Sequence, residues 1–96
     1  DEIEILNNIS YFVHKLFMFY SYIKTHGNPD PKEITGSGMP KFLLEKLSSL
    51  SMRFDEQKYF KILEILSLSM LDMKLKGKMD KNSYFISTLI RVQEII

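Results

Sequence analysis

Apolar residues recur at intervals of three and four along most of this chain, which is the spacing of one face of an α-helix. The pattern runs through five segments: residues 3–24, a short segment from 31, residues 40–50, residues 56–76 and a last segment after 80. No segment shows the apolar and polar alternation that is typical of a strand. We therefore predict an all-α fold, a compact bundle of about five helices, as one domain over residues 1–96.

Residues that begin and end helices separate these segments. Carboxylates that can accept hydrogen bonds from a first turn precede three of them: Asp30, Asp55 and Asp80. Glycines that can end a helix follow three of them: Gly27, Gly36 and Gly77. Glu33 stands where it can complete a capping box with Asp30, and Phe54 and Tyr59 hold the two positions of a hydrophobic staple.

The two longest helices carry more apolar residues than one face can hold. In the first helix, four aromatic residues fall outside the main stripe: Phe12, Phe17, Phe19 and Tyr22. In the helix after Asp55, the apolar face is widened by Phe60, Ile62, Ile65 and Leu68. In the last helix we expect six apolar residues on the buried side: Phe85, Ile86, Leu89, Ile90, Val92 and Ile96. A helix that is apolar over most of its circumference needs cover on several sides, and we expect another chain to provide part of it.

Composition narrows the class of protein. With 45% hydrophobic and 12% aromatic residues the chain is too apolar for a disordered segment, yet its apolar runs are too interrupted to span a membrane. The absence of cysteine excludes disulfides and thiolate metal sites, which fits a cytoplasmic protein. The chain opens on Asp1 without a methionine or a targeting signal, so we interpret it as the C-terminal fragment of a longer bacterial protein.

The residues needed for catalysis do not come together in this pattern. His14 and His26 are the only imidazoles, and the carboxylates are scattered among caps and polar faces. The Gly36-Ser37-Gly38 segment lacks the preceding strand and the following lysine of a phosphate-binding loop. We therefore predict no catalytic residue, no metal and no cofactor in this chain.

Two features allow a DNA-binding alternative. The short helices around Glu33 and after Pro40 can form a helix-turn-helix, although the second offers no Arg, Asn or Gln for bidentate contacts to bases. Four lysines near the end of the long helix can contact phosphates weakly: Lys74, Lys76, Lys78 and Lys81. A net charge of +1 argues against a strongly electrostatic partner. A stand-alone helical protein-interaction module is the other alternative.

Several pieces occur along the chain in an order found in one known family. They are residues 16–20, Pro31 to Ile34, Pro40 to Leu43 with Lys46, Arg53 to Asp55, and Asp72 four residues before Lys76. In this order they resemble the C-terminal domain of delta subunits of the bacterial DNA polymerase III clamp loader.

This resemblance implies a non-catalytic role in DNA replication. Such domains form the collar of the clamp loader with gamma/tau and delta-prime type subunits, and they would contact the sliding clamp only through upstream domains and DNA at most indirectly. The parent complex would be the DNA polymerase III holoenzyme, a nucleotidyltransferase. The expected interface anchors are aromatic: Phe17, Tyr20, Tyr22, Phe60 and Phe85. Asp72 and Lys76 would form an ion pair typical of the family.

Overall fold

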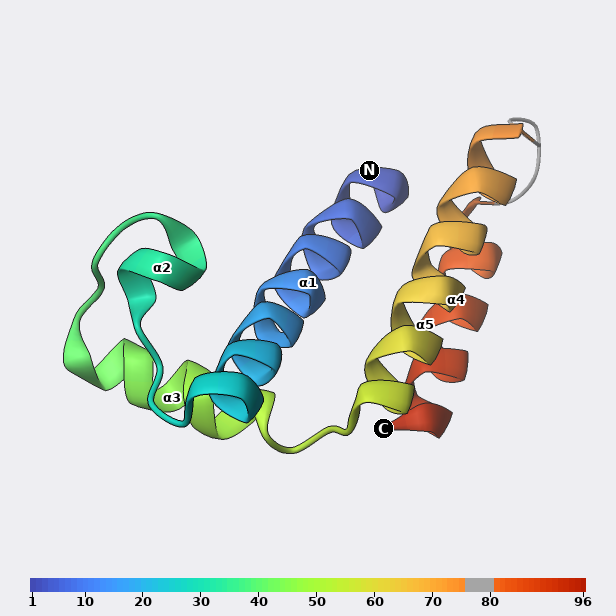
Figure 1. Ribbon diagram of the computed structural model, residues 1–96. Coiled ribbons are helices and arrows are strands. Elements are labelled where there is room, and N and C mark those ends of the chain that lie inside the picture. Colours follow the sequence, from blue (N-terminus) through green and yellow to red (C-terminus); the bar gives the residue numbers. More distant parts are fainter. Residues whose placement is uncertain (76–80) are drawn as a thin grey trace.

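The chain folds into five α-helices in a computed structural model that describes residues 1–75 and 81–96 (Figure 1). The helices are α1 (Glu2–His26), α2 (Pro31–Thr35), α3 (Lys41–Ser51), α4 (Glu56–Leu75) and α5 (Lys81–Ile95). The described residues contain no strand, and none of the described helices is long and apolar enough to cross a membrane. The predicted all-α bundle of five helices is confirmed.

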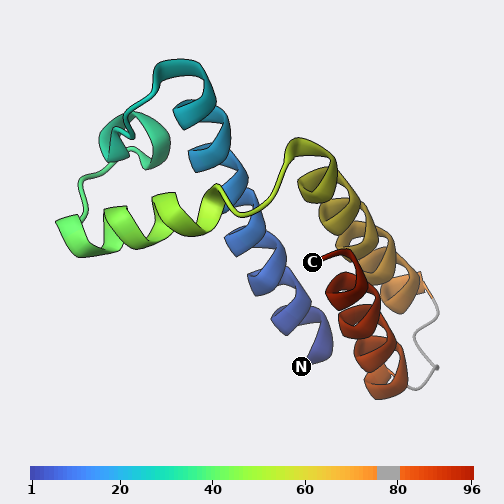
Figure 2. The ribbon, with the colours of Figure 1, turned by 90° about the horizontal axis from the view of Figure 1, so that it is seen from below.

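Helix α1 lies in the middle of the molecule and separates two groups of helices. On one side α4 and α5 run side by side as an antiparallel pair, and on the other side α2 and α3 pack against the second half of α1 (Figures 1 and 2). Figure 2 shows α3 running across α1 and not along it. The molecule is therefore elongated, with extents of 46 × 24 × 19 Å.

The first half of α1 packs against the α4–α5 pair. The buried cluster on this side consists of Leu6, Ile62, Leu66, Met73 and Val92. Polar contacts between described residues also join α4 to α5 beside this cluster. The Thr88 hydroxyl bonds the Ser69 hydroxyl at 3.0 Å, and the Tyr84 hydroxyl donates to Asp72 Oδ2 at 2.6 Å. Thr88 and Ser69 are both buried, where a hydroxyl without a partner is costly, so their contact fixes the pairing of the two helices. The bond from Tyr84 to Asp72 is only partly buried and adds to this pairing.

The second half of α1 packs in a separate cluster with α2, α3 and the start of α4. This cluster consists of Leu16, Phe19, Ile34, Leu47 and Tyr59. Phe19 is fully buried although it lies outside the main apolar stripe, because α3 crosses α1 on that side. The expectation that α1 needs cover on more than one side is confirmed for this half of the helix.

The turn from α3 to α4 is held by caps that the sequence predicts. Asp55 Oδ1 accepts from the Lys58 amide at 2.9 Å, and the Phe54 and Tyr59 rings meet edge to face at 5.7 Å as the two members of the staple. The Tyr59 hydroxyl also donates to the Ser51 carbonyl at 2.6 Å. This bond connects the end of α3 to the first turn of α4.

The other predicted helix ends have three different outcomes. Gly27 and Gly36 follow α1 and α2 with φ angles of 89° and 86°, the left-handed region in which glycine is favoured. Asp30 accepts from the Lys32 amide as predicted, but the Glu33 carboxylate accepts from Tyr22 and closes no capping box. The predicted stop at Gly77 and cap at Asp80 lie outside the described residues.

The buried face of α5 agrees with the predicted one only in part. Val92 is buried and Phe85 and Leu89 are half-buried, as predicted. Thr88 is buried as well, whereas three predicted residues are about half exposed or more: Ile86, Ile90 and Ile96. Tyr84 and Thr88 turn α5 toward their polar partners on α4, and this rotation leaves the isoleucines outside. A pattern that counts only apolar residues therefore missed Thr88 and overestimated the burial of these three isoleucines.

Candidate functional site

The chain exposes more surface than its size requires. Its accessible area is 6527 Å², whereas a folded monomeric protein of 11.3 kDa exposes roughly 5,700 Å². The excess of about 800 Å² equals the area that each partner buries in a standard protein–protein interface. The elongated shape is one cause, since the radius of gyration is 15.1 Å against roughly 12.5 Å for an average domain of this length.

Large apolar side chains form part of this exposed surface. They lie on α1, α3, α4 and α5: Ile5, Phe12, Phe42, Leu43, Phe60, Leu68, Leu71, Leu75, Ile86 and Ile90. Scattered apolar residues are normal on a protein surface, but a continuous apolar patch marks a site of interaction.

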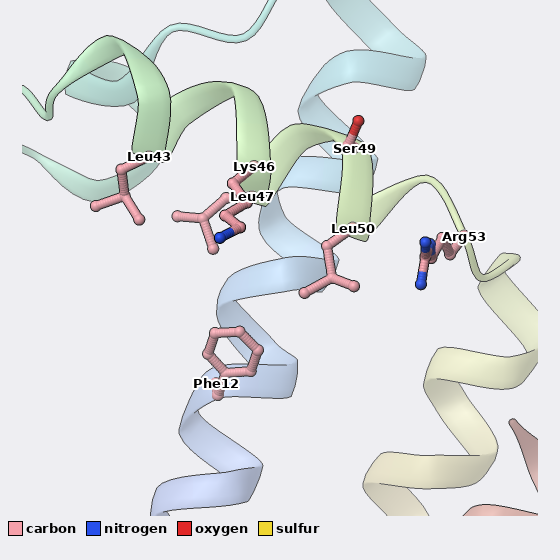
Figure 3. A pocket seen from close by; sticks show the side chains of 7 residues that line it. All are labelled: Phe12, Leu43, Lys46, Leu47, Ser49, Leu50 and Arg53. Carbon is pink, nitrogen blue, oxygen red and sulfur yellow. The ribbon is translucent and has the colours of Figure 1, made fainter.

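The corner between α1 and α3 forms a groove of about 450 Å³. Phe12 of α1 lies on one side, and Leu43, Leu47 and Leu50 point toward it from α3 (Figure 3). The three leucines share a face of α3 because they are spaced by three and four residues. Leu47 is buried at the base of the groove, and Leu43 and Phe12 are 37% and 42% exposed. We call this feature the α1–α3 groove.

Two basic side chains, Lys46 and Arg53, add charge to the α1–α3 groove. Among the described residues, no acidic side chain lines the groove and neither of these cations takes part in an ion pair. Both are exposed. The groove is thus apolar inside and positively charged at its border.

A second apolar surface lies on α4, turned away from the buried residues of that helix. Phe60 is 52% exposed, and Leu68, Leu71 and Leu75 repeat at intervals of three and four toward the end of the helix. We call these four residues the α4 face. It is a stripe along one side of the helix.

The five predicted aromatic anchors lie in different environments. Phe17 and Tyr20 are half-buried, with their rings 5.3 and 5.4 Å from that of Tyr59. Phe85 is half-buried against the cluster around Leu66. Phe60 alone among the predicted anchors presents about half of its surface to solvent. Whether any of the five binds a partner stays a prediction.

Tyr22 has a bond of its own within the chain. Its hydroxyl donates to Glu33 Oε2 at 2.7 Å, and its ring stacks on His26 at 4.2 Å between centroids. The bond to the carboxylate, together with desolvation, raises the pKa of Tyr22 to about 12. Tyr22 therefore connects α1 to α2 as a protonated donor at neutral pH.

Only some of the charged residues that the sequence analysis singled out lie in the part of the chain that the structure describes. Asp72 accepts a hydrogen bond from Tyr84, which raises the pKa of that tyrosine, and its predicted partner Lys76 lies outside the described residues. Lys74 is exposed at the end of α4. Lys78 and the side chain of Lys81 also lie outside the described part of the chain.

The sequence contained a signal for the α1–α3 groove that the prediction did not use. Phe12 falls outside the main stripe of α1, and Leu43, Leu47 and Leu50 follow one another at intervals of four and three within the predicted helix of residues 40–50. What the pattern does not contain is the crossing of α3 over α1, which brings these residues together. None of the groove residues was among the predicted anchors.

Neither metal chemistry nor a helix-turn-helix is supported by the described residues. Over residues 1–75 and 81–96, no three His, Cys, Asp or Glu side chains gather in a way that could hold a metal. Helix α2 has five residues and packs mainly on α1, and α3 carries the largely exposed Phe42 on its surface. A recognition helix would instead present polar side chains to base edges.

Comparison with known proteins places the chain in a family. The family model described as HP_1247_C, C-terminal domain, matches residues 1–92. The chain belongs to this family. A Helicobacter pylori protein from strain J99, described only as "Protein", is 27% identical over 89 residues, which cover 93% of the chain and 26% of the relative. The corresponding protein of strain 26695 is 26% identical over the same proportions.

As a member of the HP_1247_C C-terminal domain family, the chain spans about a quarter of the length of these curated relatives. No solved structure matches it. These findings correct the resemblance to clamp-loader delta subunits, because the matching family is HP_1247_C and no delta family matches. The pieces that suggested delta are helix caps, apolar stripes and an acid–base pair at i and i+4, which recur in many helical bundles.

Proposed function

We propose that this chain is a non-catalytic association domain, which binds another protein through its exposed apolar surfaces in the cytoplasm. The observation that carries the proposal is the excess exposed area of about 800 Å², part of which lies over large apolar side chains. The α1–α3 groove and the α4 face are the surfaces that we propose for binding.

The type of residue on these surfaces supports a protein partner. Aromatic side chains such as Phe12 and Phe60 concentrate binding energy when a partner encloses them. Phe12 already has a concave apolar surrounding, and Phe60 rests on Phe17 with the ring centroids 5.4 Å apart. Side chains held by such contacts lose little freedom on binding, which favours affinity.

The balance of charges supports a protein partner over a nucleic acid. The net charge is +1, and the basic residues of the groove border an apolar interior. Affinity for nucleic acids comes mainly from many lysines and arginines that contact phosphates together. A surface with an apolar centre and a charged border is instead the common anatomy of a protein interface.

The proposal can be tested by crosslinking in cells of the native host. A tagged copy of the chain would be compared with two variants, Phe12→Gln for the groove and Leu71→Gln for the α4 face. Tyr11→Gln is the matched control, because Tyr11 is 70% exposed on α1 and does not line the groove. Circular dichroism would verify that each variant is folded.

We expect one defined protein to crosslink to the wild-type chain and to the Tyr11→Gln control. With one of the two surface variants, the amount of this crosslinked product should fall at least ~10-fold, as for loss of an interface anchor. If the folded variants and the wild type show the same crosslinked proteins in the same amounts, these surfaces are not binding sites and the proposal is wrong.

A further inference from the structure

We propose that the α1–α3 groove binds an amphipathic helix of a partner protein, with acidic residues beside its apolar face. This inference rests on the proposed association function and names the chemistry of the partner. It is carried by the shape of the groove, the kind of side chain inside it and the unpaired charges at its border.

The shape of the groove fits a helix. Leu43 and Leu50 are seven positions apart on α3, a rise of roughly 10 Å or two helical turns. An incoming helix presents apolar side chains over the same length at positions i, i+3, i+4 and i+7. Phe12 limits the groove on the side of α1, and the volume of about 450 Å³ accommodates several such side chains. Helices that cross, as α1 and α3 do, leave a corner that a third helix can fill.

The charges at the border specify the acidic residues. Lys46 and Arg53 are exposed, and within the described part of the chain they have no carboxylate partner. An arginine can bind a carboxylate through two parallel hydrogen bonds, which fixes both position and orientation. A partner helix with basic residues at these positions would be repelled, so the same charges also exclude wrong partners.

The direct test uses two synthetic helical peptides as probes. Both carry the same four leucines at positions i, i+3, i+4 and i+7, and they differ only in having Glu or Lys beside the leucine face. Binding to the isotope-labelled full chain would be measured by the changes in its amide NMR spectrum. We expect the Glu peptide to bind at least ~10-fold more tightly than the Lys peptide, with the largest changes on α3 and around Phe12.

Two pairs of variants separate the groove from the rest of α3. The double variant with Arg53→Glu and Lys46→Glu should reverse the preference for the Glu peptide. Lys41→Glu is its control and should leave the preference unchanged, because Lys41 lies on α3 but outside the groove. Leu43→Gln should weaken binding of both peptides at least ~10-fold, as expected for an anchor of the interface. Phe42→Gln is its control, because Phe42 is the neighbouring residue, is 71% exposed and does not line the groove.

The outcomes distinguish this inference from the broader proposal. Equal binding of the two peptides, or changes confined to the α4 face, would overturn the acidic helix as the ligand. Concentration-dependent self-association that Leu43→Gln abolishes would also overturn it, because the occupant would then be a second copy. If crosslinking in cells depends on Leu71 and not on Phe12, the association function holds and only the role assigned to the groove is wrong.

Discussion

Removal of a single hydroxyl group, by Tyr59→Phe, tests how the two groups of helices are joined. Tyr59 is fully buried at the start of α4, and its hydroxyl donates to the Ser51 carbonyl at 2.6 Å. Its ring lies among those of Phe17, Tyr20 and Phe54, with centroids 5.3–5.7 Å away. Phenylalanine keeps these ring contacts, so the substitution removes the hydrogen bond alone.

The expected cost follows from the burial of both partners. Ser51 is also fully buried, so its carbonyl would lose a partner in a place that water does not reach. A buried acceptor without a partner costs about 1–3 kcal/mol. For a domain of this length, this loss lowers the midpoint of thermal unfolding by roughly 5–15 °C.

Thermal and urea unfolding, followed by circular dichroism, measure this loss. Tyr11→Phe is the control, because Tyr11 is largely exposed and its hydroxyl takes part in no hydrogen bond among the described residues. We expect the control to unfold like the wild type. If Tyr59→Phe does so as well, within about 0.5 kcal/mol, the bond to Ser51 does not stabilise the α3–α4 turn and the reasoning fails.

The contribution of the buried Tyr59 to stability should depend on pH. Burial raises the pKa of Tyr59 from its ordinary value of 10.0 to about 12. Its contribution to stability is therefore complete below pH 10 and is lost as the pH rises toward 12, because the unfolded chain releases the proton first. The difference in unfolding free energy between the wild type and Tyr59→Phe should narrow over this range by roughly 1.4 kcal/mol per pH unit. A difference that stays constant would contradict the raised pKa.

Two further predictions concern polar and backbone details of the fold. Thr88→Val should lower the free energy of unfolding by about 1–2 kcal/mol, because it leaves the buried Ser69 hydroxyl without its partner. Adding Ser69→Ala should recover much of this loss, which a double-mutant cycle followed by urea unfolding would measure. Gly36→Ala should lower the free energy of unfolding by about 1 kcal/mol, because Gly36 has a φ of 86°. Gly38→Ala should be nearly neutral, because no atom lies near its added Cβ. Equal unfolding midpoints for the two variants would contradict the strain expected at Gly36.

Much of the fold could be predicted because local signals agree with tertiary structure here. Asp55 with its staple residues Phe54 and Tyr59 determines the start of α4 through contacts within five residues, so the sequence alone contains that information. The end of α1 at Gly27 is local in the same sense. Such elements do not depend on how the helices later pack.

The candidate site could not be predicted in this way, because it depends on packing between distant segments. Phe12 meets Leu43 and Leu50 only when α3 crosses α1, and the apolar period of each helix is the same for any crossing. The predicted anchors were chosen as aromatic residues, and Phe17 and Tyr20 are partly enclosed by the chain itself. The burial of Thr88 on α5 was missed for a similar reason, since Thr88 takes its orientation from Ser69, nineteen residues away.

Helix α1 also has a consequence for how the chain folds. It contributes Leu6 to one buried cluster and Leu16 to the other, and Val13 packs against both. Neither cluster is complete without this helix, so opening of α1 removes the support of both at once. Amide protons of α1, α3 and α4 should therefore exchange with solvent through one common opening event, and the two halves of the molecule should behave as a single cooperative unit.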